Sequence, residues 1–468
     1  MVIAAQMPAP EWRGKSRERP PRHCISISAA PLSDRNSSRQ DLRMTQARVD
    51  FSSLQHRLRR MAGRDPNEEH RAATPLELLF DLTFVVAFGL AADQLAHLLA
   101  EGHFLAGISG FVFAMVAVTW AWMNCTWFAS AYDTDDWVSR VATMVQMVGV
   151  LIIALGLPEM FHSIDAGEPL HNDVMVAGYV VIRLALVTQW LRAARHDPLR
   201  RRTSLASAWV IALAQVGWIS LLFIRTVPLA ILFPVIAIVV ILDFLGPWVI
   251  ESRIGGIPWH AHHLAERYGL LIIIALGESI FGTIASVSAI VEHEGWSSEA
   301  IIVIIAGTAL TFGMWWTYFI VPAGLILHRF RERALVLGYS HMLLFTSIAA
   351  TGAGLHVAAY SIEGEAHISA VAAVLTVVIP VLVFVLVVFA LYSYLVAALD
   401  PFHVGLILGT VALLALSVIL VGVGVSMGVS LLIAAAAPLV VVIGYETLGY
   451  RHEQAALQKA LGSDDVRD

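Results

Sequence analysis

The sequence predicts an all-α protein, a polytopic bundle of about twelve transmembrane helices. Of its 468 residues, 58% are hydrophobic and only 14% are charged, whereas soluble domains average about 25% charged residues. The hydrophobic residues form long runs, and about 20 apolar residues are enough to span a bilayer. Charged residues gather between these runs. Most of the chain is therefore expected to face lipid or other apolar helices.

Twelve runs reach the length of a membrane span. The first six lie near residues 78–100, 104–130, 138–158, 173–195, 204–225 and 227–250. The last six lie near residues 264–290, 299–323, 333–359, 367–398, 402–422 and 426–448. Only a few small residues around Gly422 and Gly424 separate the last two spans, which predicts a tight hairpin there.

The spans divide the chain into four regions. Residues 1–73 are rich in Arg, Pro and Ser and contain no sustained apolar run, which is typical of a disordered tail. Residues 74–250 and 251–448 each contain six predicted spans. Residues 449–468 form a second, short tail. The prediction is thus two six-helix halves between two cytoplasmic tails.

Basic residues alternate from one loop to the next. The basic tail lies on the same side as the following arginines: Arg140, Arg192, Arg195, Arg200, Arg201, Arg202, Arg253, Arg329, Arg331, Arg333 and Arg451. The opposite side has Arg225 and little else that is basic, and its loops include the acidic segments 158–173, 291–299 and 361–367. The positive-inside rule then predicts that both termini are cytoplasmic. An even number of spans also requires both termini on one side.

The two halves resemble each other at nearly constant spacing. Glu77 and Glu266 open the first and seventh spans, and Arg140 and Arg333 open the third and ninth. The second and eighth spans share an aromatic pattern, at Trp120, Trp122, Trp127 and Phe128 and again at Trp315, Trp316, Tyr318 and Phe319. A six-helix repeat keeps its orientation, so this pattern would correspond to parallel repeats, as in some transporters.

Carboxylates in the first span are the first candidates for a functional site. Each carboxylate costs about 2.5–3.5 kcal/mol at the centre of a bilayer. Glu77 and Asp81 are four residues apart and share a helix face, which favours a cation or proton pathway in the bundle interior. The alternatives are that Glu77 caps the helix after Thr74 and that Asp81 belongs to a buried ion pair.

Glu278 is the other candidate for this pathway, together with Glu266 at the start of the same span. It lies twelve residues beyond Glu266, which is about 18 Å deeper. Gly277 and Gly282 permit close helix approach, so the Glu278 side chain is expected to face protein. Arg183 in the fourth span and His341 in the ninth are its predicted partners.

The loop before the third span is strongly acidic. Its charged residues are Asp133, Asp135, Asp136 and Arg140. Acids at a helix start complement the positive end of the helix, but three acids exceed that need. They therefore either pair with Arg140, Arg333 or the cluster at Arg200, or form a vestibule that attracts cations.

Segment 258–269 contains the densest group of histidines. His262 and Glu266 are four residues apart and could share a metal ion, but the segment offers no clear third ligand. Imidazoles at a helix start also suit a pH-responsive element. Cys24 and Cys125 are too few for metal-binding cysteine spacing or a disulfide framework. We therefore predict no metal and no other cofactor.

Four motifs in this chain resemble the bacterial low temperature requirement A family. They are PLELLFDLTFVVAF at 75–88, WFASAYDTDDWVSR at 127–140, PWHAHHLAERYGLLIIIALGESI at 258–280 and GMWWTYF at 313–319. The resemblance implies a polytopic protein of the bacterial inner membrane, and it implies no defined biochemical activity. Potassium channels with two six-helix repeats are less similar, because their first helix carries an F-S-D motif and this chain has Phe80-Asp81 without the serine.

Three hypotheses follow from these features. In the first, the bundle moves or responds to a small ion or solute through Glu77, Asp81, Glu266 and Glu278, supported by the other charges named above. In the second, it is a non-transporting scaffold or stress sensor in which the same charges form structural pairs. In the third, it is an intramembrane metal-dependent enzyme that uses residues 260–266. The lipid bilayer is the expected partner, a homo-oligomer is compatible with the sequence, and no motif indicates binding to nucleic acid.

Overall fold

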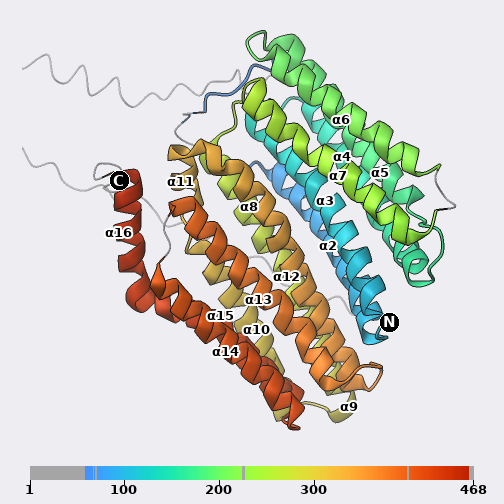
Figure 1. Ribbon diagram of the computed structural model, residues 1–468, viewed down its shortest axis with the longest axis vertical. Coiled ribbons are helices and arrows are strands. Elements are labelled where there is room, and N and C mark those ends of the chain that lie inside the picture. The colour runs from blue at the N-terminus through green and yellow to red at the C-terminus, as the bar shows by residue number, and fades with distance from the viewer. Residues whose placement is uncertain (1–57, 67, 69–70, 224–226, 398–399, 463–468) are drawn as a thin grey trace, which may run out of the picture. The chain divides into compact units, whose positions relative to one another are not determined.

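The computed structural model of the chain describes residues 58–66, 68, 71–223, 227–397 and 400–462 (Figure 1). Within these ranges the regular secondary structure is helical, and no strand is present. Most of the predicted basic tail lies outside the described residues. Cys24 lies there as well.

Six long helices occupy the first half of the sequence: α2 (Pro75–Ala100), α3 (Phe104–Tyr132), α4 (Trp137–Asp165), α5 (Asp173–His196), α6 (Arg201–Leu221) and α7 (Leu229–Arg253). The second half contains α8 (Ala261–Ala275), α9 (Gly277–Glu294), α10 (Ser298–Phe319), α11 (Ala323–Arg329), the 3-10 turn η2 (Arg331–Arg333), α12 (Ala334–Glu363), α13 (Ala370–Val396), α14 (Pro401–Gly422), α15 (Met427–Gly444), the π-helical η3 (Tyr445–Gly449) and α16 (Tyr450–Leu461).

Twelve helical segments of the described ranges are long and apolar enough to cross a membrane. This finding confirms the predicted fold class and the predicted number of spans. Several spans of the second half are composite. For example, α8 and α9 together form the seventh span, and α10 and α11 together form the eighth.

A reciprocal capping box fixes the start of α2. The Glu77 backbone N–H donates to Thr74 Oγ1 at 3.2 Å, and the Thr74 backbone N–H donates to Glu77 Oε2 at 2.8 Å. Pro75 occupies the first position of the helix, where its missing N–H leaves no bond unmade. The predicted capping role of Glu77 is therefore present in the structure.

The interior of the bundle forms around α2 and α12. α2 packs against α3, α4, α8 and α12, and α12 also packs against α9 and α13. Glycines allow these backbones to approach closely: an ideal Cβ on Gly354 of α12 would lie 2.4 Å from the carbonyl oxygen of Thr376 on α13. In Figure 1, helices α2–α7 lie together beside helices α8–α16. Asp81 and Glu77 of α2, and Arg267 and Glu278 of the second group, lie where these two groups meet.

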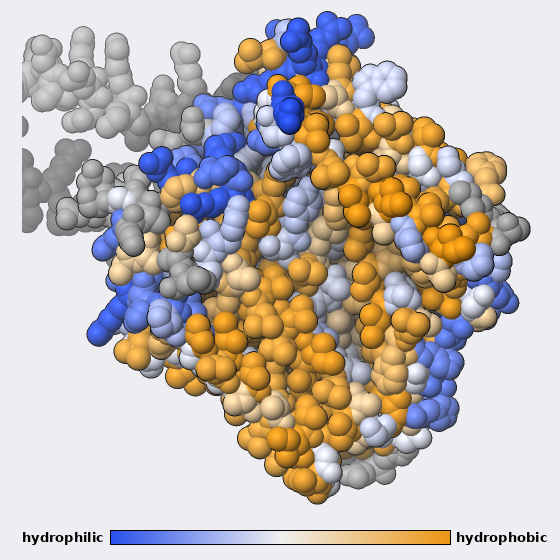
Figure 2. All heavy atoms as spheres, viewed as in Figure 1, coloured by the Kyte–Doolittle hydropathy of each residue, from blue (hydrophilic) through white to orange (hydrophobic). Residues whose placement is uncertain are grey.

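The outward surface of the helices is hydrophobic. Leu155, Leu213 and Phe281 are each more than half exposed. Figure 2 shows hydrophobic side chains across the middle of the visible face and hydrophilic ones toward its ends. Helices that are apolar on their outer faces as well as their inner faces are typical of membrane spans.

Candidate functional site

Two acids of α2 meet one arginine of α8. Asp81 and Glu77 lie one turn apart on the face of α2 that packs against α8. The Arg267 Nε lies 3.1 Å from Asp81 Oδ2, and its Nη2 donates to Asp81 Oδ1. The Arg267 Nη1 lies 2.9 Å from Glu77 Oε1. The guanidinium of Arg267 therefore contacts both carboxylates. Its contact with Asp81 is bidentate, a geometry that the planar guanidinium favours.

Three further side chains surround this ion pair. The Trp122 Nε1–H donates to Asp81 Oδ1 at 2.7 Å. The His263 Nε2 lies 3.1 Å from Glu77 Oε1, and because an ionised carboxylate only accepts, Nε2 carries the hydrogen. The Arg71 Nη2 lies 4.0 Å from the same oxygen. We call the six residues the α2–α8 cluster: Arg71, Glu77, Asp81, Trp122, His263 and Arg267.

The α2–α8 cluster is buried and balanced in charge. Asp81 is 0% exposed and Arg267 is 1% exposed. Burial lowers the pKa of Arg71 to about 10, which leaves it charged at neutral pH. Two guanidiniums thus oppose two carboxylates. Buried charges are tolerated when they are paired and hydrogen-bonded in this way, so the structure places Asp81 in the buried ion pair that was one of its two predicted roles.

Glu278 follows a one-residue break in the hydrogen-bonded helix of the seventh span. The break is at Leu276, whose backbone stays in the α-helical region, and Glu278 stands in the first turn of α9. An ideal Cβ on Gly89 of α2 would lie 2.7 Å from Glu278 Oε1, and one on Gly352 of α12 would lie 2.8 Å from the Glu278 backbone. The carboxyl group therefore lies against α2. Gly89 is eight residues beyond Asp81, which is about 12 Å farther along α2.

The Glu278 carboxyl has no hydrogen-bond or ion-pair partner among the described residues. It interacts electrostatically with the carboxyl of Asp93 on α2, and Asp93 interacts with His356 on α12. The hydroxyl of the adjacent Ser279 is also buried without a partner. We call Asp93, Glu278 and His356 the Glu278 cluster. In contrast to the α2–α8 cluster, it contains two acids and no arginine.

The partners predicted for Glu278 are wrong. The Arg183 Nη2 lies 2.8 Å from Asp243 Oδ2 on α7, so Arg183 is already paired. His341 accepts a hydrogen bond at Nε2 from the Tyr318 hydroxyl at 2.7 Å, and its Nδ1 donates to the Leu337 carbonyl at 2.7 Å. Because a carbonyl oxygen cannot donate, these contacts fix the tautomer of His341.

In the acidic loop, one of the predicted pairings is present. The Arg140 Nε donates to Asp135 Oδ1 at 2.8 Å. Asp136 instead caps α4 through Ser139 N and pairs with Arg192 on α5. Burial by itself would raise the pKa of Asp136, but the hydrogen bonds from Arg192 and Ser139 outweigh it and hold that pKa below its usual value.

The other pairings expected of this loop are absent. Asp133 accepts from the backbone N–H of Asp135 at 2.9 Å. Arg333 donates to the Leu395 carbonyl at the end of α13, and Arg200 lies 3.6 Å from Asp197. Both arginines are therefore engaged by residues nearer to them than the acidic loop.

Glu266 and His262 lie outside the buried cluster. Both side chains are exposed, and Glu266 Oε2 accepts from the Ala73 backbone N–H at 3.2 Å. The placement of Glu266 in the interior pathway was wrong, because residues 262 and 266 lie on an exposed stripe of α8, about 100° or more around the helix from the buried Arg267. In the described part of the chain, no three His, Cys, Asp or Glu side chains form a group that could hold a metal ion.

Sequence reasoning missed the residue that organises the site. Glu266 and Arg267 are adjacent in the sequence. Glu266 was predicted to lie in the interior, but the structure places Arg267 there. The buried positions of α8 include His263, Leu264, Arg267, Leu271 and Ile272. This helical stripe, read from the apolar positions, places Arg267 inside and Glu266 outside. No pattern in the sequence indicated that the Trp122 indole would contact Asp81.

These features define a multi-pass helical membrane protein whose interior contains paired and unpaired ionisable residues. Residues 72–440 match the bacterial low temperature requirement A protein family. The chain belongs to this family, and the resemblance predicted from the motifs is confirmed.

One similar curated protein comes from Rhizobium meliloti (strain 1021) and is described as uncharacterized. It is 30% identical over 268 residues, which are 55% of this chain and 60% of that protein. The similarity thus spans less than two thirds of the relative. No solved structure matches the chain.

Proposed function

We propose that this protein is a membrane transport protein that exchanges protons at Glu278 while it moves a small ion or solute. The observation that supports the proposal is the Glu278 carboxyl within a membrane span, which has no hydrogen-bond or ion-pair partner among the described residues. A carboxylate without a counter-charge is costly in such a span, and intramembrane acids of this kind mark proton relays and ion pathways.

The α2–α8 cluster has a different role in this proposal. Its charges are balanced, so Asp81 and Arg267 hold α2 against α8 and are not themselves free to bind an ion. A cavity of about 40 Å³ adjoins the cluster and is lined by Glu77, Arg267, Asp133 and Arg140 among others. This cavity connects the acidic loop with the cluster, and the acids that line it would attract cations.

The orientation and location are part of the same proposal. Arginines gather in the loops that end α5 and α7 and in the segment at η2, whereas the loops after α4, α9 and α12 contain acids. We therefore place both termini in the cytoplasm and the protein in the bacterial inner membrane. The division into two six-helix halves, at 74–250 and 251–448, remains a prediction of the sequence pattern.

Proton flux into proteoliposomes tests the proposal. The full chain is reconstituted with an internal pH-sensitive dye, and a valinomycin-clamped potassium gradient drives protons inward. Wild-type protein is expected to acidify the lumen, and Glu278→Gln to reduce the rate to that of empty liposomes. Glu292→Gln, an exposed acid on the same α9 helix, is the matched control and is expected to keep the wild-type rate. An unchanged rate in Glu278→Gln would remove Glu278 from the mechanism.

A structural scaffold or stress sensor is the second candidate, and the closed, balanced α2–α8 cluster favours it. In that case the wild-type protein would show no flux, and neutralising the cluster would change only stability. Asp81→Asn would then lower the melting temperature without any transport phenotype. Flux that depends on Glu278 would contradict this candidate.

A further inference from the structure

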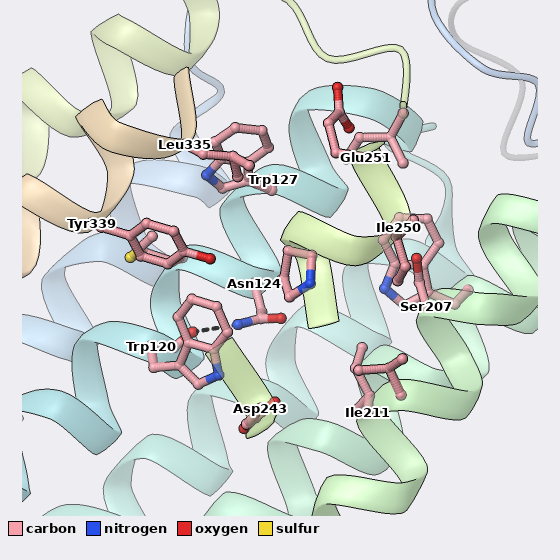
Figure 3. Close-up of a pocket in the computed structure, with 15 residues that line it drawn as sticks. Trp120, Asn124, Trp127, Ser207, Ile211, Asp243, Ile250, Glu251, Leu335 and Tyr339 are labelled. Atoms are coloured by element: carbon pink, nitrogen blue, oxygen red, sulfur yellow. Dashed lines mark hydrogen bonds between the residues drawn. The ribbon is translucent and has the colours of Figure 1, made fainter. Parts of the chain in front are cut away.

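A cavity with an aromatic lining lies between α3, α5, α6, α7 and α12, separate from both charged clusters (Figure 3). Its volume is about 80 Å³. One water molecule requires about 10–15 Å³ by the same measure, so the cavity has room for a ligand of about five to eight heavy atoms. It is therefore large enough for a small metabolite and too small for a peptide or a lipid chain.

Four aromatic rings form much of the cavity wall. Trp120 and Trp127 come from α3, Trp190 comes from α5, and Tyr339 comes from α12. Indole and phenol rings attract a cation over their faces, and the attraction increases when the cation leaves water. The same rings offer apolar contact to methyl groups. This lining favours a cation with apolar substituents.

The charged residues of the cavity are both acids. Asp243 and Glu251 line it, and none of its lining residues is Arg, Lys or His. Figure 3 shows the two acids at opposite ends of the cavity. They are eight residues apart on α7, which corresponds to about 12 Å. The end at Glu251 would therefore repel an anion and attract a cation, whereas Arg183 balances the charge of Asp243 at the other end.

Asp243 belongs to an ion pair behind the cavity wall. Its Oδ2 accepts from Arg183 at 2.8 Å and from the Tyr179 hydroxyl at 3.2 Å. Arg183 does not line the cavity, but its charge balances that of Asp243. The negative charge that a ligand would meet therefore comes from Glu251.

One further polar group remains available for a neutral part of a ligand. The Asn124 Nδ2 donates to the Trp120 carbonyl at 2.8 Å, which leaves Asn124 Oδ1 as an acceptor. A hydroxyl group can donate to this oxygen.

We propose that this cavity binds a small organic ammonium ion with methyl substituents and a hydroxyl group. The aromatic rings line the space for the cationic head, Glu251 supplies the negative charge, and Asn124 Oδ1 accepts a hydrogen bond from the hydroxyl. The inference does not rest on proton exchange at Glu278. Binding of the ammonium ion is measured without an ion gradient. A negative result there leaves proton exchange at Glu278 untouched, and a negative result in the proton flux assay leaves the cavity untouched.

Titration of the detergent-solubilised full chain with choline tests the inference. Choline has the predicted charge, size and hydroxyl, and 3,3-dimethylbutan-1-ol is its neutral counterpart of the same shape. We expect saturable quenching of tryptophan fluorescence by choline, confirmed by calorimetry. Choline is expected to bind at least about tenfold more tightly than the neutral alcohol, because only the cation is attracted to the rings and to Glu251.

Variants locate the binding site. Trp127→Leu is expected to weaken choline binding by about 2- to 30-fold. Glu251→Gln removes an exposed acid and is expected to weaken binding by about two- to fivefold, with the difference vanishing at high salt. The control is Trp209→Leu, which removes a tryptophan of α6 that is 73% exposed and outside the cavity. It is expected to bind choline like the wild type.

Three results would overturn the inference. They are the absence of saturable choline binding to the wild type, equal affinity for the neutral alcohol, and equal weakening by Trp127→Leu and Trp209→Leu. The first two use unmodified protein, so a folding defect in a variant cannot produce them.

Discussion

At the scale of single residues, the main distinction is between charges that are paired and charges that are not. Asp81 is held by Arg267 and Trp122, whereas Glu278 has no hydrogen-bond or ion-pair partner among the described residues. Both lie within membrane spans and both are expensive to ionise there. Pairing makes the first a structural element of the α2–α8 contact. The lack of a counter-charge leaves the second available to exchange a proton.

Removing the shared arginine should destabilise the protein strongly. Arg267→Ala would leave Glu77 and Asp81 buried beside each other without their main counter-charge, which typically costs about 3–5 kcal/mol. Thermal unfolding followed by intrinsic fluorescence measures the loss. Arg253→Ala, at the exposed end of α7, is the control and should change stability little. A melting temperature for Arg267→Ala equal to that of the control would show that the ion pair does not support the fold.

Asp136 should make stability depend on acid pH. Its pKa in the folded state lies below the usual value because the hydrogen bonds from Arg192 and Ser139 outweigh burial. A carboxyl with a lowered folded pKa contributes stability above its unfolded pKa of about 3.9, and this contribution is lost as the pH falls further. The Asp136→Asn variant should therefore be less stable than the wild type at pH 7, and its stability should fall less than that of the wild type on acidification. Parallel pH profiles for the two proteins, from pH 7 to pH 3, would contradict this assignment.

At the scale of helices, close packing at glycines positions Glu278. Gly352 allows α12 to approach the backbone of α9 at Glu278, and Gly89 leaves room for its carboxyl on α2. The position of the acid thus depends on two neighbouring helices as well as on the break before α9. Side chains added at these glycines would displace it.

Gly352→Ala tests this packing. The new Cβ would lie 2.8 Å from the backbone of Glu278, and overpacking of this kind costs about 1–3 kcal/mol. Gly277→Ala is a matched control beside the same acid, because a Cβ there meets nothing within 4 Å. We expect the first to lower the melting temperature and the second to leave it unchanged or slightly raised. The reverse order would contradict the described α9–α12 contact.

The helices themselves were well predicted from the sequence, and their interior contacts were not. Apolar runs and the cost of exposing backbone groups in lipid fix the spans, so all twelve were located, and the Thr74–Glu77 cap was anticipated. Partners depend on how helices rotate and pack. The rotation of α8 puts Arg267 in the interior and Glu266 on the surface, and the contact between α5 and α7 brings Arg183 to Asp243. The spacing of these residues in the sequence indicates neither the rotation nor the contact.

At the scale of the whole molecule, the proposed topology places the loop after α4 on the side opposite to the cytoplasm and the loop after α5 in the cytoplasm. Single cysteines placed at Gly167 and at Leu199, in a chain lacking Cys24 and Cys125, test this arrangement. These sites lie in consecutive loops, after α4 and after α5. A membrane-impermeant maleimide applied to intact cells should label position 167 and reach position 199 only after permeabilisation. Labelling of both sites in intact cells, or of position 199 alone, would overturn the proposed topology.

The proposed function requires that Glu278 takes up and releases a proton inside the membrane. An apolar carbodiimide reports on this exchange, because it enters the bilayer and reacts with protonated carboxyl groups. Mass spectrometry of the labelled protein in native membranes should find the adduct at Glu278, and labelling should decrease as the pH rises. Absence of an adduct at Glu278, or labelling independent of pH, would contradict the claim.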